Sequence, residues 1–130
     1  MPLVKIEILD GKTFDYKKAL LDSVHRALVE AVQIPERDRM QKLYELKPDN
    51  FETAPNMTDK ATFIEITMFS GRSPEIKKKL YQKIVDNLQS SPGIDPTDVF
   101  IVLHEEPLVN WGIRGGKPAS EINFDFKIDI

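Results

Sequence analysis

The chain opens with apolar residues at alternate positions and then changes to a helical spacing. The alternation over residues 4–8 predicts a half-buried strand, which Gly11 ends. Over residues 13–33 the apolar side chains follow the 3.6-residue period of an amphipathic helix. They are Leu20, Leu21, Val24, Ala27, Leu28, Ala31 and Val32. A second strand is predicted over residues 39–46, so this part of the chain is typical of a β-α-β unit.

The same pattern returns 60 residues later without a gap. The second helix has its own start signals, because Ser73 can cap it and the fixed φ of Pro74 suits the first helical position. Identical pairs at this offset are Ile6 and Ile66, Gly11 and Gly71, Leu20 and Leu80, Leu28 and Leu88, Ile34 and Ile94, Asp38 and Asp98, and Glu45 and Glu105. Chance does not supply so constant a register. The chain therefore contains a duplicated β-α-β unit, with pseudo-repeats 2–46 and 62–106.

This duplication predicts the fold class, a two-layer α/β arrangement of the α+β class. Each strand-helix-strand unit runs parallel and right-handed, and two such units can share a sheet by pairing their first strands antiparallel. The expected result is a four-stranded mixed sheet with two helices on one face. Residues 47–60, with two prolines and two asparagines, are predicted to be a loop between the units. We treat residues 1–130 as one domain.

A C-terminal extension, residues 107–130, follows the second unit. Its glycines and Pro118 indicate turns, and apolar residues then alternate from Ile122 to Ile130, the pattern of a strand with one apolar face. We therefore expect a β-hairpin or strand here. Because a two-layer domain leaves the other sheet face and its edges uncovered, we expect this extension to lie at an interface with another subunit.

Composition excludes several classes of function. A chain of 130 residues without cysteine has no thiol nucleophile, and His25 and His104 have no ligand partner at metal-binding spacing, so no metal site is predicted. A net charge of -3 argues against a nucleic-acid partner. The first residues do not resemble a signal peptide, and no apolar stretch approaches the length of a membrane span. We expect a soluble, cytoplasmic protein without a membrane partner.

Pro2 directly follows Met1 and offers chemistry that no other residue type has. Once Met1 is removed, the chain begins with a secondary amine, and an α-amino group has a pKa of about 7.7 to 8.0. Burial or a neighbouring carboxylate can then make it a base or an acid. With Met1 in place, the nitrogen is an inert amide and Pro2 only starts an edge strand.

The predicted topology brings charged residues to Pro2. Parallel strands start at the same end of a sheet, so Asp38, just before the second strand, is expected beside Pro2. An approximate two-fold relation between the units brings the end of the third strand, with Arg72, to the same place. At the opposite end Thr62 replaces Pro2, so we expect one site per chain.

Four short motifs occur in order along this duplicated pattern. They are Pro2 with its apolar strand, Pro35-Glu36-Arg37-Asp38-Arg39, Gly71-Arg72-Ser73 and Asn110-Trp111-Gly112. Together they resemble the tautomerase superfamily, nearest its malonate semialdehyde decarboxylase-like branch, over nearly the whole chain. The resemblance implies a homotrimer, a catalytic amino-terminal proline and small oxo acids or their enols as substrates. It implies no metal and no organic cofactor.

The resemblance also implies roles for individual residues. Pro2 would transfer the proton, Asp38 would orient a water or tune the proline, and Arg72 would hold the substrate carboxylate. Ser70 stands where the compared decarboxylases carry a second arginine, which bears on decarboxylation more than on tautomerisation. The substrate-binding candidates are Ser70, Arg39, Trp111 and Arg114.

Structural roles remain open for the same residues. Asp38 can cap a turn, as its repeat mate Asp98 can, and Arg72 can be a solvated residue ahead of a helix. Trp111 can anchor an interface instead of forming a pocket wall.

The reaction is open as well. A neutral Pro2 would move a proton between two positions of an oxo acid, which is tautomerisation. A cationic Pro2 beside an ionised Asp38 would polarise a carbonyl or protonate a carbanion, which is hydration or decarboxylation chemistry. A secondary amine can also form an iminium with an aldehyde. The alternative from another class is a non-catalytic oligomer that binds small acids.

Overall fold

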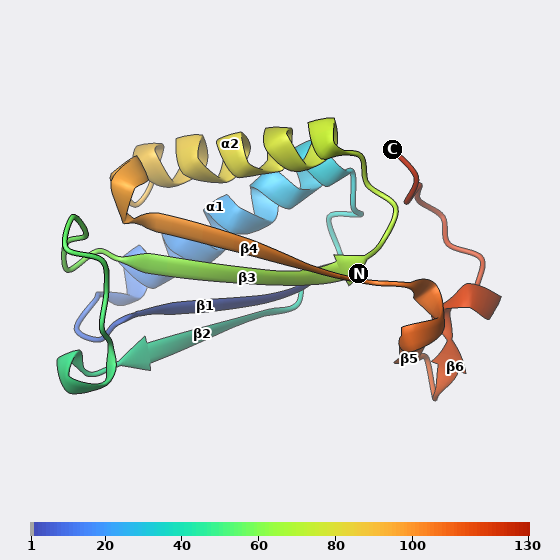
Figure 1. The fold of residues 1–130 in the computed structure, drawn as a ribbon, viewed down its shortest axis with the longest axis horizontal. Coiled ribbons are helices and arrows are strands. Elements are labelled where there is room, and N and C mark those ends of the chain that lie inside the picture. The colour runs from blue at the N-terminus through green and yellow to red at the C-terminus, as the bar shows by residue number, and fades with distance from the viewer. Residues whose placement is uncertain (1) are drawn as a thin grey trace.

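Two β-α-β units share one four-stranded sheet (Figure 1). The computed structural model describes residues 2–130, so the expected removal of Met1 lies outside the described residues. The main elements are β1 (Leu3–Leu9), α1 (Phe14–Val32), β2 (Gln41–Leu46), β3 (Thr62–Phe69), α2 (Pro74–Ser90) and β4 (Val99–Glu106). Single 3₁₀ turns are η1 (Pro48–Asn50), η2 (Pro96–Asp98), η3 (Leu108–Asn110) and η4 (Ala119–Glu121).

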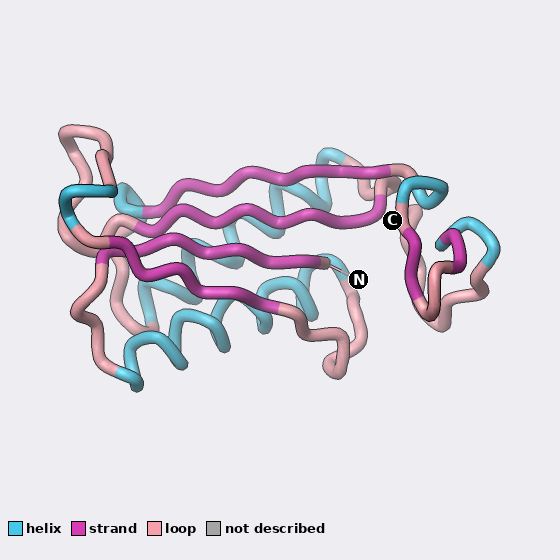
Figure 2. The backbone as a smooth tube through the Cα atoms, turned by 90° about the horizontal axis from the view of Figure 1, so that it is seen from below, coloured by secondary structure: helices cyan, strands magenta, loops and turns pink. Residues whose placement is uncertain are grey.

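The sheet has the order β2-β1-β3-β4. Strands β1 and β2 run parallel, as do β3 and β4, and the units meet where β1 and β3 pair antiparallel. Both helices lie on one face, and Figure 2 views the sheet from the opposite, uncovered face. The predicted four-stranded mixed sheet with two helices on one face is therefore confirmed.

Each helix begins at the residue that the sequence indicated. The hydroxyl of Thr13 accepts a hydrogen bond from the Tyr16 N–H at 3.1 Å, and that of Ser73 accepts from the Ile76 N–H at 3.3 Å. Caps of this kind stabilise a helix by about 1 kcal/mol. Helix α1 ends at Gln33, whose φ of 61° is left-handed and cannot continue the helix.

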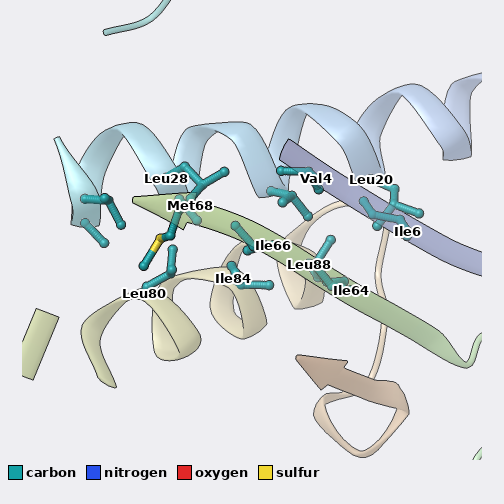
Figure 3. Packing of buried hydrophobic residues seen from close by; sticks show 14 of the residues in the cluster. Val4, Ile6, Leu20, Leu28, Ile64, Ile66, Met68, Leu80, Ile84 and Leu88 are labelled. Atoms are coloured by element: carbon teal, nitrogen blue, oxygen red, sulfur yellow. The ribbon is translucent and has the colours of Figure 1, made fainter. Parts of the chain in front are cut away.

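The core lies between the sheet and the two helices (Figure 3). Along β1, Val4, Ile6 and Ile8 are at most 3% exposed, while Leu3 and Lys5, which alternate with them, face solvent. The opposite sheet face keeps large apolar side chains in solvent. Its exposed members are Leu3, Tyr44, Phe100 and Val102. The expectation that another subunit covers exposed parts of this domain stays a prediction.

Hydrogen bonds repeat with the 60-residue offset of the sequence. The Asp10 N–H donates to the Leu46 carbonyl at 2.9 Å, and the Ser70 N–H donates to the Glu106 carbonyl at 3.0 Å. The turns η1 and η3 also stand 60 residues apart and are followed by Phe51 and Trp111. The two units therefore share local contacts as well as strand order.

The C-terminal extension is only partly as expected. Strands β5 (Gly112–Ile113) and β6 (Lys117–Pro118) confirm the hairpin, although each has two residues. Residues 122–130, which we call the tail, form no strand within the described chain. The predicted alternation does persist, because every second tail residue from Ile122 to Ile130 is half-buried. The tail passes the end of the sheet instead of an edge, so it has no strand ladder to join (Figure 1).

Candidate active site

The strand register brings Pro2 to the residues that precede β2. The Val4 N–H donates to the Met40 carbonyl at 3.0 Å, and Val4 pairs with Gln41. Extending this register two residues beyond the paired positions brings Pro2 level with Arg39 and one residue from Asp38. On its other side, the pairing of Val4 with Ile66 places Pro2 level with Met68, near the end of β3. Pro2 is buried.

Arg72 stands just beyond this end of β3 and is only 5% exposed. Its Nη1 donates to the Phe69 carbonyl at 3.1 Å, while its buried Nε has no hydrogen-bond partner in residues 2–130. Burial lowers the pKa of Arg72, and the nearby Glu105 carboxylate raises it in part. The guanidinium remains charged at neutral pH. A buried cation with an unused donor favours an anionic ligand, because the unpaired donor is costly to bury.

Asp38 lies in the wall of a cavity of about 280 Å³. Its own N–H donates to the Pro35 carbonyl at 2.9 Å, which fixes the turn before β2. Across the cavity, Arg114 lies 5.5 Å from the centre of the Phe124 ring, within cation-π range. The lining residues are Pro35, Arg37, Asp38, Arg114, Phe124, Asp125 and Phe126. Asp38 and Arg114 are thus brought together as walls of one cavity.

Aromatic contacts join this cavity to Arg72. Phe124 lies 5.2 Å from Phe69, and Phe69 meets Trp111 edge to face at 4.9 Å, as ring centroids. The indole N–H of Trp111 donates to the Glu106 carbonyl at 3.2 Å, the same carbonyl that accepts from the Ser70 N–H. Ser70 and Trp111 are therefore grouped around Phe69, whose carbonyl holds Arg72, and Phe124 links this group to the Asp38 cavity.

The Arg39 side chain points to helix α1 and not into the Asp38 cavity. Its Nη2 donates to the Asp22 carboxylate on α1 at 2.5 Å, and it does not line the Asp38 cavity. It instead borders a wider depression of about 560 Å³ that includes Leu3, Met40 and Tyr44. The substrate-binding role of Arg39 stays a prediction.

Sequence reasoning missed part of the cavity wall. Phe124 and Phe126 were recognised only as members of an alternating segment, and that signal shows which side chains share a face but not what they cover. The Arg37 guanidinium donates to Asp125 at 2.6 Å and holds the pKa of that carboxyl below its ordinary value. No local sequence pattern predicts the pair of Arg37 and Asp125, because the two residues are 88 positions apart.

Residues 2–130 contain no group of three His, Asp or Glu side chains placed to hold a metal ion. In the same residues, neither helix is long and apolar enough to cross a membrane.

Family profiles and curated proteins match most of this chain. A profile described as a tautomerase enzyme matches residues 38–114, and a second with the same description matches residues 2–61. The chain is 30% identical to the probable tautomerase YrdN of Bacillus subtilis strain 168, across 90% of this chain and 94% of that protein. It is 28% identical to the probable tautomerase YusQ of the same strain, across 90% of this chain and 96% of that protein.

Solved structures with the same fold extend the comparison. A malonate semialdehyde decarboxylase, studied as wild type, as an amino-terminal proline-to-alanine mutant and in an inactivated form, superposes with a TM-score of 0.82 and 27% identity. The match covers 91% of this chain and 94% of that one. A fused 4-OT solved as a symmetric trimer gives a TM-score of 0.81 and 25% identity, covering 91% and 96% of the two chains.

Proposed function

The chain belongs to the tautomerase family, and on this premise we propose that it interconverts the keto and enol forms of a small 2-oxo acid, using the Pro2 amine as acid and base. The carrying observation is the placement of Arg72. Its buried guanidinium, with an unused Nε donor, stands at the same end of the sheet as Pro2. An oxo acid supplies the carboxylate that such a donor requires.

The proposed step moves one proton within the substrate. The neutral Pro2 nitrogen takes a proton from the carbon next to the carbonyl, and the electrons of the broken C–H bond form the enolate, whose charge rests on oxygen. Pro2, now a cation, gives the proton to that oxygen, which yields the enol and restores the amine. The reverse sequence converts enol to ketone. Arg72 holds the carboxylate throughout, so the carbon stays in reach of the amine.

Asp38 supports a second candidate reaction. An ionised carboxylate about 4 to 6 Å from an amine favours the cation, which suits hydration or decarboxylation of a 3-oxo acid. Two observations support this candidate: the register of β1 and β2, extended beyond its paired residues, brings Asp38 close to the level of Pro2, and the superposed malonate semialdehyde decarboxylase is described with both activities. Consumption of malonate semialdehyde, with formation of acetaldehyde and carbon dioxide, distinguishes this reaction from tautomerisation.

We also infer a homotrimer. Exposed apolar side chains on the uncovered sheet face, including Phe100 at 56% exposure, need a partner surface, and the fused 4-OT relative is a trimer. Light scattering should give three times the chain mass of 14.9 kDa. A monomer at micromolar concentration contradicts this assembly.

The decisive experiment compares two forms of one protein. One carries a free Pro2, verified by mass spectrometry, and the other keeps an extra glycine before Pro2 after removal of a tag, so that the nitrogen is an amide. We expect the free form alone to accelerate ketonisation of phenylenolpyruvate, followed by ultraviolet absorbance. Equal activity of both forms defeats the proline mechanism. Binding of small oxo acids without turnover favours the non-catalytic alternative.

A further inference from the structure

The segment between α1 and β2, residues 33–40, carries Asp38 and is tied to α1 on one side by a buried histidine. His25 is 2% exposed, and its Nε2 lies 2.9 Å from the Glu36 carbonyl. A carbonyl oxygen only accepts hydrogen bonds, so Nε2 carries the proton and donates. This contact fixes the backbone two residues before Asp38.

A second tie holds the other side of Asp38. The Arg39 guanidinium donates to Asp22 Oδ1 at 2.5 Å, and Lys18 donates to Asp22 Oδ2 at 2.7 Å. Both donors lower the pKa of Asp22. Asp22 and His25 are three residues apart on α1 and therefore share one face of the helix. Asp38 thus stands between two attachment points on the same helix.

The duplicated unit serves as an internal control for what these ties do. At the 60-residue offset, Gln82 and Val85 replace Asp22 and His25, and Val99 replaces Arg39. None of these can form the same contacts. The corresponding segment nevertheless folds, because Asp95 caps the turn η2 by accepting from the Thr97 N–H at 2.9 Å. That segment is held to α2 by backbone hydrogen bonds from Gly93 and Ile94 to the Leu88 carbonyl, so the β-α-β unit does not require these side-chain ties in order to form.

We propose that His25 and Asp22 are positioning residues that hold the Asp38 carboxylate against the Pro2 amine. This inference rests on the proposed function, and it explains why the two ties occur only in the unit that begins with Pro2. The other charged groups that face the Asp38 cavity are Arg37, Arg114 and Asp125. Of these, Arg37 is already paired with Asp125.

The physical consequence concerns the pKa of Pro2. An ionised Asp38 nearby stabilises the cationic amine and raises its pKa, so a displaced Asp38 lets that pKa fall. The limb of the pH-rate profile that reports Pro2 should then move to lower pH, whether Pro2 acts as base or as acid. A purely structural role for His25 would reduce the amount of folded enzyme and leave that limb in place.

The test uses His25→Leu, which removes the donor, and His25→Gln, whose amide can donate from a similar position. We expect His25→Leu to lower kcat at its optimal pH at least fivefold, with a smaller change in KM, to shift the Pro2 limb to lower pH and to speed amide exchange at Asp38. His25→Gln should recover most of the wild-type behaviour. Asp22→Asn, at a half-buried site, should shift the limb in the same direction by a smaller amount.

Ser23→Ala is the matched control. Ser23 is 2% exposed on the same helix and donates to the Ser91 carbonyl at 2.6 Å, a segment without candidate site residues. We expect it to lower stability and leave both the pH limb and the exchange at Asp38 unchanged.

The inference is overturned if His25→Leu and Asp22→Asn both leave the Pro2 limb of the pH-rate profile and the amide exchange at Asp38 unchanged. The proposed function fails separately, if wild-type protein with a free Pro2 shows no proline-dependent activity. Amide exchange at Asp38 is measured without substrate. In that case it still shows whether the His25 and Asp22 contacts hold the segment that carries Asp38.

Discussion

The two ends of the duplicated sheet have the same backbone arrangement, but one end is closed by side-chain contacts and the other keeps a cavity. At one end, Asp98 is 1% exposed and accepts from both the N–H and the hydroxyl of Thr58, at 2.7 and 2.6 Å. Lys12 closes the same end by donating to the Asp59 carbonyl at 2.9 Å. Residues 47–60, the loop between the units, therefore seal this end, which we call the sealed end.

The other end, which holds Pro2, keeps a cavity. Its aspartate, Asp38, is half-buried and lines about 280 Å³ of open space. The residue 60 positions after Thr58 is Pro118, which has neither an N–H nor a hydroxyl to donate to Asp38. A duplicated fold thus supplies two similar frames, and the residues that are not repeated decide which frame keeps a cavity.

The largest expected difference between the ends concerns their cations. Arg72→Ala should lower kcat/KM about 100-fold, about 2.7 kcal/mol, because it removes charge-assisted hydrogen bonds to the substrate carboxylate. Lys12→Ala, at the sealed end, should stay within about twofold of wild type. Steady-state ketonisation kinetics measure both. Arg72→Lys keeps the charge but loses the planar fork, so it should fall between them. Equal losses in Arg72→Ala and Lys12→Ala would remove the distinction between the ends.

Asp98 and Asp38 occupy equivalent positions at the two ends. In stability, the substitution at the sealed end should have the larger effect. Asp98→Ala removes a buried carboxylate that accepts two hydrogen bonds from the exposed Thr58, so it should lower the free energy of unfolding by about 2 kcal/mol. Activity should be unchanged. Asp38→Ala should cost less than about 1 kcal/mol in urea unfolding and yet reduce turnover. A large stability loss in Asp38→Ala, with activity retained per folded molecule, would assign Asp38 to the fold.

Pro2 and Thr62 begin the equivalent strands and give the next comparison. Pro2→Ala should lower kcat/KM at least tenfold, about 1.4 kcal/mol, because the primary amine of alanine replaces the secondary amine of proline. Thr62→Val removes a hydroxyl that donates to the Lys60 carbonyl at 2.8 Å, so it should affect stability alone. Mass spectrometry must first show that wild type and Pro2→Ala begin at residue 2. Wild-type kinetics in verified Pro2→Ala would exclude the proline from the chemistry.

The repeated features were the predictable ones. The helix cap at Ser73, the strand alternation and the antiparallel pairing of β1 with β3 follow from local start signals, from periodicity and from the constant offset. Each depends on residues that are close in sequence or related by the constant 60-residue offset. For the same reason, the meeting of the Pro2, Asp38 and Arg72 positions at one end of the sheet could be anticipated without coordinates.

The cavity wall could not be predicted, because it depends on single long-range contacts. The tail carries Phe124 to the Asp38 cavity and Ile128 to Gly71, where the left-handed backbone (φ 136°) and the nearby Ile128 leave no room for a Cβ. Arg39 likewise turns to Asp22, a choice among several carboxylates that strand periodicity does not encode. Alternation predicted which tail residues share a face but not the surface that they cover.

The smallest expected effect lies at the sealed end and has the opposite sign. The buried Tyr16 hydroxyl has no hydrogen-bond partner in residues 2–130, and burial, with Asp59 and Asp98 nearby, raises its pKa to about 12. The unfolded chain loses this proton near pH 10, so stability should decline as pH rises from about 10 to 12. Tyr16→Phe removes the unpaired hydroxyl, so it should be neutral or stabilising by up to about 1 kcal/mol at pH 7 and should flatten that alkaline decline. Urea unfolding at pH 7 and pH 11 measures both. Because Ile76 takes this position in the other unit, a marked loss of stability in Tyr16→Phe would contradict this prediction and would mean that the Tyr16 hydroxyl stabilises the sealed end through a contact that the other end lacks.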